Sequence, residues 1–458
     1  MNNLILLCVG VIVLCVGGLA LVLIYNKPIF LVYFQIVYCA SMRFLISELH
    51  FPEVLRFLPD AVTLMLFVHC ILCIKRSEYI AVTKLPLFFI GGFLVLSVMS
   101  FFLNEQPILS LIWGIRVVVR AFVFWFACFL FLRKKDVVNM VQILMCILAI
   151  NALAASFQYF IQGYSFDYVG GLFGVETGSN TEMNTFIVQM LICAMTMFIY
   201  YKCGWKFIGL TIVLCVYIAA ISELKVVFLE IPMIFFILLL FSGWKRRSIL
   251  LLVAGGLAVY FSMMLFFILY PDWANFFNIE TIMEYIGDDT GYAGQGTVNR
   301  MSSIPFVFEH MYKSPIQMLF GYGLGNADSW ALFTSSLYQE FGDYRYNYFG
   351  FSMLLAEDGV LGTICYLGFF ASVCICGFIY RLKDPKNACW YTMAIAGSVL
   401  VVFHQIYSST LRVDIIYNYM FWMSIPFIMM REACLENSSP GDAEAGGSQA
   451  VCAAAAKR

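Results

Sequence analysis

Apolar residues occur in stretches of about 20 along most of the chain, close to the length that an α-helix needs to cross a bilayer. These stretches are residues 4–25, 28–47, 59–74, 85–103, 108–132, 137–160, 183–201, 205–221, 224–242, 248–270, 349–380, 388–406 and 415–430. The pattern predicts an all-α fold, a polytopic transmembrane bundle of about 12–13 spanning helices. Residues 43–59, where charges and prolines interrupt the pattern, are expected to form a re-entrant or interfacial piece if they do not belong to a span.

The composition excludes a water-soluble fold. Of the 458 residues, 62% are hydrophobic and 12% are charged, whereas soluble domains have roughly 45–50% and about 25%. We therefore expect one membrane domain over residues 1–431. Residues 432–458 are small and polar without helical periodicity, which predicts a disordered cytoplasmic tail. The first 25 residues lack a basic start and a small-residue cleavage site, so they are expected to remain as the first helix.

The distribution of charge predicts the orientation of the bundle. Basic residues recur at every second connection between spans, and the positive-inside rule places these connections in the cytoplasm. They are Lys75, Arg76, Arg133, Lys134, Lys135, Lys202, Lys206, Lys245, Arg246, Arg247, Arg381, Lys383 and Lys386. The alternate connections are acidic or neutral, and the longest of them, residues 271–346, is expected to be a large loop containing short helices. The net charge of -1 gives no basic surface for nucleic acid, which we do not expect as a partner.

Two arginines lie inside the span at residues 108–132. A charged side chain at the centre of a bilayer costs about 2.5–3.5 kcal/mol on insertion scales, so Arg116 and Arg120 must be compensated. Their i, i+4 spacing places both guanidinium groups on one helix face, about 6 Å apart, which suits neighbouring anionic oxygens such as those of a diphosphate. Snorkelling to the interface or pairing with a neighbouring acid is the alternative.

A second polar cluster, SELKVVFLEIP, opens the span at residues 224–242. Glu223 and Glu230 are seven positions apart and would share one helix face, whereas Lys225 would point elsewhere. The cluster, which also contains Ser222, predicts either an intramembrane ion pair that joins two helices or a polar site that lines a cavity.

The large loop is acidic and rich in aromatic residues, which suits a neutral sugar better than a polyanion. Its charged residues are Asp272, Glu280, Glu284, Asp288, Asp289, Arg300, Glu309, Lys313, Asp328, Glu340, Asp343 and Arg345. Apolar residues at helical spacing between Met301 and Met311 predict a short helix across the membrane face, opened by Gly296 and Thr297. Arg300 would lie in its first turn and face a membrane-level cavity. The alternative for Arg300 is a capping contact or an ion pair within the loop.

The loop returns to the membrane through FGYGLGNADSW, in which Gly321, Gly323 and Gly325 alternate with other residues. Glycine permits positive φ and close backbone approach, so the segment predicts either a nest of N–H groups that binds an anion or a tight turn. It is not a dinucleotide-binding motif, because its flanks are membrane helices rather than the strand and helix of a βαβ unit.

Taken in order, these features resemble the bacterial O-antigen polymerase and O-antigen ligase superfamily of membrane glycosyltransferases, over residues 85–430. The residues that carry the resemblance are Ser222 with Lys225, Arg300, Pro315 with FGYGLGN, and LLAEDGVLG with Glu357, Gly359 and Gly362. Ligases of this superfamily typically carry a histidine at the position of Tyr348, so the sequence favours a polymerase. Lys225 stands where many members carry arginine, which keeps the charge but loses the bidentate fork.

The resemblance implies a polymerase of undecaprenyl-diphosphate-linked oligosaccharide repeat units in the bacterial inner membrane, with the large loop in the periplasm. Such a reaction mainly requires alignment of the substrates and neutralisation of the leaving diphosphate, so no metal and no cofactor is expected. The other expected partners are membrane lipid and a chain-length regulator protein. The residues expected to bind diphosphate or glycan are Arg116, Arg120, Lys225, Arg300, Gly321, Gly323, Gly325 and Arg345. Arg300 and Glu309 are expected to be catalytic, with Glu182 and Asp343 as other choices for the general base.

Three other functions stay open from the sequence: an O-antigen ligase, a flippase or transporter of lipid-linked saccharides, and a non-catalytic assembly protein. A transporter usually places its polar site at the bilayer midplane between repeats. The polar positions here gather towards the outer side beside one large loop, which favours an enzyme.

Overall fold

The computed structural model describes residues 27–74, 78–243, 246–251, 296–329 and 333–437, with single positions between 253 and 264. Within these ranges the regular structure is helical, apart from an isolated bridge between Ser329 and Thr334. Eight of the described helices are long and apolar enough to cross a membrane. The prediction of an all-α polytopic bundle is therefore confirmed.

The helix boundaries follow the apolar segments closely. The long helices are α2 (Pro28–Ser47), α3 (Leu58–Ile74), α4 (Lys84–Leu103), the continuous α5 (Ile108–Gly114), η3 (Ile115–Val119) and α6 (Arg120–Phe131), α7 (Lys134–Phe160), α8 (Ser179–Ile199), α16 (Gly350–Lys383), α17 (Ala388–Tyr407) and α18 (Ile415–Asn437). Helix α18 is not one of the eight that are long and apolar enough to cross a membrane. Two shorter apolar helices are α9 (Trp205–Ile221) and α10 (Val227–Ser242). At residues 43–59, where charges and prolines interrupt the apolar pattern, α2 continues to Ser47 and a short 3-10 helix, η1 (Glu53–Phe57), leads into α3.

Some expected features lie outside the described residues. They are the first span at residues 4–25, most of the span at 248–270, the first part of the large loop at 271–295, and the tail from residue 438. Helix α18 itself extends to Asn437, so it runs six residues past the expected end of the membrane domain at residue 431.

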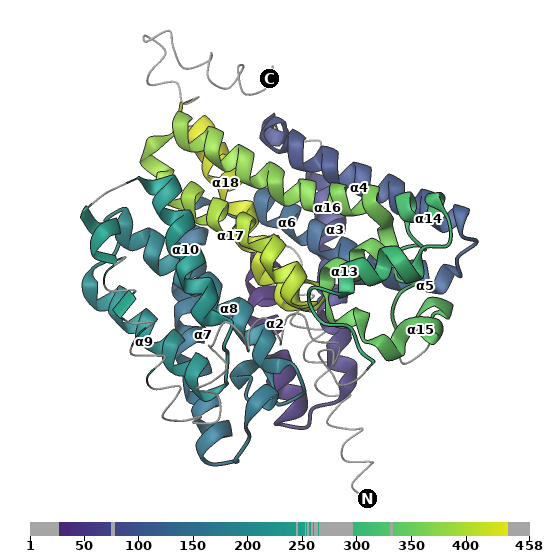
Figure 1. The fold of residues 1–458 in the computed structure, drawn as a ribbon. Helices are drawn as coiled ribbons and strands as arrows, with labels where there is room; N and C mark the ends of the chain where they lie inside the picture. Colours follow the sequence, from purple (N-terminus) through teal and green to yellow (C-terminus); the bar gives the residue numbers. More distant parts are fainter. Residues whose placement is uncertain are drawn as a thin grey trace, which may run out of the picture.

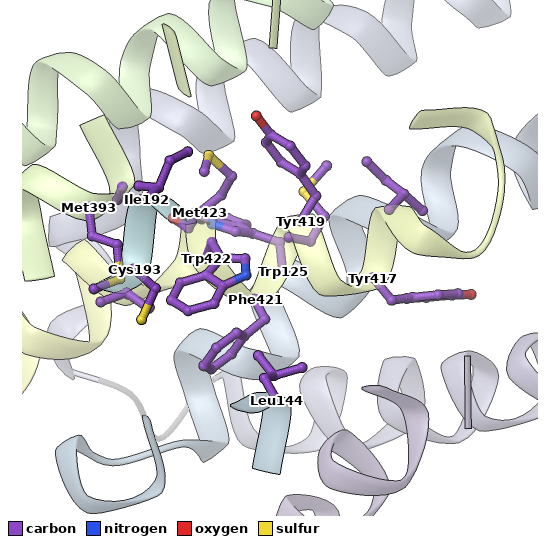
Figure 2. Close-up of a cluster of buried hydrophobic side chains, with 14 of the residues drawn as sticks. Trp125, Leu144, Ile192, Cys193, Met393, Tyr417, Tyr419, Phe421, Trp422 and Met423 are labelled. Carbon is purple, nitrogen blue, oxygen red and sulfur yellow. Dashed lines mark hydrogen bonds between the residues drawn. The ribbon is translucent and has the colours of Figure 1, made fainter. Parts of the chain in front are cut away.

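Helices α17 and α18 occupy the centre of the bundle, with α7 to α10 gathered on one side and α4, α5 and α14 on the other (Figure 1). Helix α18 is apolar on nearly all sides and buried along most of its length, as expected for a helix surrounded by other helices. Trp125 of α6 packs edge-on against Phe369 of α16 and Phe427 of α18, with ring centroids 5.2 and 5.3 Å apart. Its indole N–H donates to the Met423 carbonyl at 3.1 Å, so this side chain joins three helices. Trp125 and Met423 belong to the buried cluster drawn in Figure 2.

Two arginines cap helices at the end of the bundle that carries the basic connections. The last carbonyls of a helix have no partner within the helix, and a cation near them is favourable. Arg431 donates to the carbonyls of Phe129, Leu130 and Leu132 at the end of α6. Arg247 donates to the carbonyl of Phe198 in the last turn of α8 at 3.1 Å, and to the carbonyl of Cys203 beyond that helix at 3.2 Å. We call the opposite end of the bundle, where α2, α4, α7 and α17 finish, the cavity end.

The glycine-rich return of the loop is locked into a break in α16. After α14 (Pro315–Phe320), Gly321, Gly323 and Gly325 have φ of 72°, 101° and 80°, and Gly359 inside α16 has φ 63°. A Cβ on Gly321 would collide with the backbone of Glu357 and Gly359, and a Cβ on Gly359 would collide with Leu319 and Gly321. Glycine is therefore required on both sides of this crossing.

Candidate functional site

A cavity of about 650 Å³ opens at the cavity end, and segments that are distant in sequence meet around it. Its walls come from the end of α2, the connection into α8, the large loop, the start of α16 and the link between α17 and α18. The lining residues are Arg43, Asp167, Thr177, Gly178, Thr181, Glu182, Arg300, Tyr348, Phe349, Tyr407, Ser408, Ser409, Thr410 and Val413. The lining thus combines two arginines, two carboxylates, hydroxyl groups and aromatic rings.

Arg300 lies on the wall of this cavity, as the sequence predicts. The expected helix begins slightly later, because α13 (Ser303–Phe306) and the π-helix η7 (Val307–Met311) form one short helical segment and Arg300 is in the turn before it. Its Nε donates to the Tyr407 carbonyl at 3.3 Å, and the guanidinium lies 4.3 Å from the centroid of the Tyr407 ring. The large loop is thereby joined to the end of α17.

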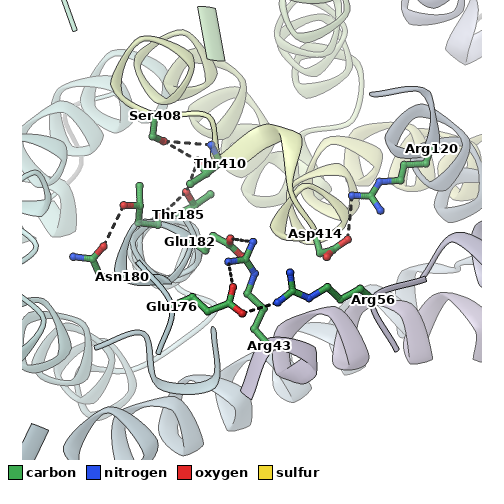
Figure 3. Close-up of polar contacts among 11 residues, drawn as sticks. Arg43, Arg56, Arg120, Glu176, Asn180, Glu182, Thr185, Ser408, Thr410 and Asp414 are labelled. Atoms are coloured by element: carbon green, nitrogen blue, oxygen red, sulfur yellow. Dashed lines mark hydrogen bonds and ion pairs between the residues drawn. The ribbon is translucent and has the colours of Figure 1, made fainter. Parts of the chain in front are cut away.

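Arg43 provides the second guanidinium of the cavity wall. Its Nη2 lies 2.6 Å from Glu182 Oε1, and its Nη1 lies 3.6 Å from Glu176, which also binds Arg56 (Figure 3). Glu182, a candidate base from the sequence, is buried and lines the cavity. The sequence did not predict the role of Arg43. The only signal was that Arg43 is one of the charged residues between positions 43 and 59 that interrupt the apolar pattern.

Arg116 and Arg120 share a carboxylate instead of lining the cavity. Arg116 Nε is 2.7 Å from one oxygen of Asp60, and Arg120 Nη1 is 3.0 Å from the other. Arg120 also pairs with Asp414 at 3.1 Å. The common face predicted by the i, i+4 spacing is present, but acids of α3 and of the link before α18 neutralise it. The alternative interpretation, pairing with a neighbouring acid, thus describes these two arginines.

We expect Asp60→Asn to destabilise the protein by about 2 kcal/mol, since one carboxylate compensates two arginines in a partly buried site. The measurement is thermal unfolding of the detergent-solubilised protein. Glu53→Gln is the matched control, because Glu53 pairs with Arg56 at 2.9 Å on an exposed surface and should change stability by less than about 1 kcal/mol. Equal effects of the two variants would contradict the compensating role of Asp60.

The glycine-rich segment does not present a free nest for a substrate anion. The Gly321 amide donates to Gln317, the Tyr322 amide to Ala356 and the Gly323 amide to the Glu357 carbonyl. The Gly325 amide is a hydrogen-bond partner of the Glu357 carboxylate. The segment forms a tight turn, and its Gly325 amide lies close to a carboxylate of the protein itself.

The same carboxylate forms a buried bidentate pair that sequence reasoning missed. Arg412 Nη1 and Nη2 lie 2.8 and 2.9 Å from the two oxygens of Glu357, and both side chains are buried. Arg412 ends a 3-10 turn, η11 (Thr410–Arg412), that belongs to the link between α17 and α18. Glu357 therefore holds in place the link between α17 and α18, which forms one wall of the cavity.

The polar cluster before α10 differs from its expected geometry. Helix α10 begins only at Val227, and Glu223 has φ 52° in the preceding turn, so Glu223 and Glu230 do not share a helix face. Burial lowers the pKa of Lys225 to about 8, and the nearby carboxylates of Glu223 and Asp167 act in the opposite direction. Because Asp167 lines the cavity, Lys225 lies close to it without forming part of the wall.

The remaining predicted site residues lie on the outer surface of the loop. Glu309 and Asp343 are exposed and do not line the cavity. Arg345 is exposed as well, with its guanidinium 5.8 Å from the ring centroid of Tyr348, which does line the cavity. Among the described residues no group of three or more His, Cys, Asp or Glu side chains could hold a metal ion.

The fold and the cavity define a class: a multi-pass α-helical membrane protein with a polar cavity where its helices end. No protein-family model matches the sequence, and no curated protein is significantly similar to it.

Proposed function

We propose that this chain is a membrane glycosyltransferase that polymerises oligosaccharide repeat units carried on undecaprenyl diphosphate. The observation that carries the proposal is the position of Arg300 on the wall of a polar cavity at the end of the bundle opposite the basic connections. With the positive-inside rule, this end faces the periplasm, where such repeat units would be joined, and the C-terminus is cytoplasmic.

The lining chemistry supports a diphosphate-linked sugar as the ligand. The planar fork of Arg300 suits phosphate oxygens, and Arg43 adds a second positive charge, although it is shared with Glu182. Tyr348 is exposed in the cavity wall and offers a flat apolar face for a sugar ring. A few convergent polar groups among apolar side chains are typical of small-molecule sites.

The reaction needs little beyond this arrangement. The anomeric carbon of the donor already bears a good leaving group, so the protein must hold the acceptor hydroxyl in line and stabilise the negative charge that grows on the departing diphosphate. Arg300 would provide that charge stabilisation. Arg116 and Arg120, bound to Asp60 and Asp414, would support the wall from behind.

Deletion of the gene tests the proposal, with surface polysaccharide and lipid-linked intermediates as the measurements. We expect single repeat units on the cell surface without a ladder of longer chains, together with accumulated lipid-linked repeat units. Loss of all repeats would instead indicate a ligase or a flippase. An unchanged ladder would overturn the proposal.

A further inference from the structure

The guanidinium of Arg300 lies over one aromatic side chain of the cavity wall. It is 4.3 Å from the centroid of the Tyr407 ring, and its Nε donates to the Tyr407 carbonyl at 3.3 Å. Both of these contacts are made to one residue, which ends α17. The ring defines the side on which the guanidinium lies, and the carbonyl defines which of its edges turns towards the backbone.

Tyr407 is itself held in place by the helices around it. Its ring stacks on that of Phe403, one turn earlier on α17, with centroids 5.8 Å apart and planes inclined by 15°. The amide of the next residue, Ser408, donates to the His404 carbonyl at 3.0 Å. The Ser408 carbonyl accepts from the amide of Gly350, at the start of α16, at 3.1 Å. The position of Tyr407 is therefore set by α17 and α16 rather than by the large loop.

Arg300, in contrast, belongs to the turn before a short helical segment of the loop. An arginine side chain carries about 2 kcal/mol of rotamer entropy. Stabilisation of charge in a transition state requires donors that are already oriented, and a misplacement of about 1 Å can cost on the order of 10²-fold in rate. A reactive side chain on a loop therefore benefits from a partner on a rigid element. The Tyr407 ring and carbonyl supply such a partner.

We propose that Tyr407 is a positioning residue, which holds the Arg300 guanidinium in the orientation that stabilises the departing diphosphate. The aromatic ring of Tyr407 is the required part of the side chain, and its hydroxyl is not. Tyr407 acts through Arg300 and needs no contact of its own with the diphosphate. The inference rests on the proposed function, since that reaction generates the charge that Arg300 stabilises.

Two substitutions of Tyr407 separate the ring from the hydroxyl. Tyr407→Leu removes the ring and leaves the carbonyl that binds Arg300, whereas Tyr407→Phe removes only the hydroxyl. Tyr201→Leu is the matched control, because Arg247 lies 3.9 Å from the Tyr201 ring centroid at the opposite end of the bundle. Tyr407→Met repeats the test if Tyr407→Leu does not accumulate in the membrane.

The assay supplies the purified protein with lipid-linked repeat units extracted from the deletion strain and measures the rate of chain extension against their concentration. We expect Tyr407→Leu to lower kcat roughly tenfold, as for a misplaced catalytic group. Its KM should stay within about twofold of wild type, because the lost interaction matters mainly in the transition state. Tyr407→Phe and Tyr201→Leu should both extend chains at nearly the wild-type rate.

The same substitution in an Arg300→Lys background shows whether Tyr407 acts through Arg300. An ammonium has no planar fork for the ring to orient. Tyr407→Leu should therefore lower kcat by less than about twofold in that background, since residues that act as a unit are not additive. A ring that merely attached the loop to α17 would cost the same factor in both backgrounds.

Three results would overturn the positioning role while the proposed function stands. In each of them the wild type extends chains. The first is a wild-type kcat in Tyr407→Leu. The second is a loss in Tyr407→Phe as large as that in Tyr407→Leu, and the third is an equal loss in the Arg300 and Arg300→Lys backgrounds. If the wild type extends no chains, the proposed function falls, and the positioning role falls with it.

Discussion

Replacing Arg300 with alanine is expected to abolish long-chain polysaccharide while the protein stays at its normal level in the membrane. Arg300 lies on the cavity wall in the turn before a short helical segment, so its removal deletes a charge without opening the core. Loss of one group that stabilises developing negative charge typically costs on the order of 10²–10³-fold in rate. The measurements are the polysaccharide ladder on a gel and an immunoblot of the membrane fraction.

Two further variants distinguish charge from geometry. Arg300→Lys should restore only part of the ladder, because an ammonium keeps the charge but not the bidentate fork. Lys313→Ala is the control in the same loop, since Lys313 pairs with Glu340 at 3.0 Å on an exposed surface. It should leave the ladder intact. A normal ladder in Arg300→Ala would remove Arg300 from phosphate binding.

The helices could be predicted closely because a bilayer imposes the same requirements on every span. Each span needs apolar side chains over a fixed length, and its backbone hydrogen bonds must be made within the helix. The segment expected at residues 85–103 is α4 (Lys84–Leu103), and the one at 388–406 is α17 (Ala388–Tyr407). Helix boundaries were predicted less closely where a non-helical turn stands in place of the first turn of a helix. The residues before Val227 were expected to continue α10, but Glu223 adopts a positive φ there.

Charge pairing could not be read from spacing in the same way. The i, i+4 pattern of Arg116 and Arg120 indicates that they share a face, but the residues opposite that face depend on which helix packs there. Asp60 lies 56 positions before Arg116, and only the packing of α3 against α6 brings the two together. The sequence offered one general signal, namely that an arginine buried in the membrane requires an acidic side chain to compensate its charge.

The partners of the glycine-rich turn could not be predicted either, because they also depend on contacts between residues that are distant in sequence. The sequence indicated that the amides of this turn could bind an anion, and in the structure one of them, the Gly325 amide, lies close to the carboxylate of Glu357. Its partner Arg412 lies 55 positions later in a segment without a recognisable motif. Links between helices, such as residues 407–413 in the cavity wall, cannot be found from hydrophobic periodicity, because their residues do not repeat at helical spacing.

Breaking the Glu357–Arg412 pair is expected to have the largest effect on stability. Arg412→Met would leave the carboxylate of Glu357 buried without its cation, which typically costs about 3–5 kcal/mol. The measurement is thermal unfolding of the detergent-solubilised protein. The control is Lys313→Met, which breaks an exposed pair and should cost less than about 1 kcal/mol.

The double variant Arg412→Met with Glu357→Leu separates a structural role from a chemical one. Replacing both charges by apolar side chains removes the unpaired carboxylate, so much of the stability lost in Arg412→Met should return. Chain extension should recover along with stability if the pair only holds the link between α17 and α18 in place. Recovered stability without recovered extension would mean that the charges act on the bound ligand through the cavity wall. A stability equal to wild type in Arg412→Met would contradict the buried pair itself.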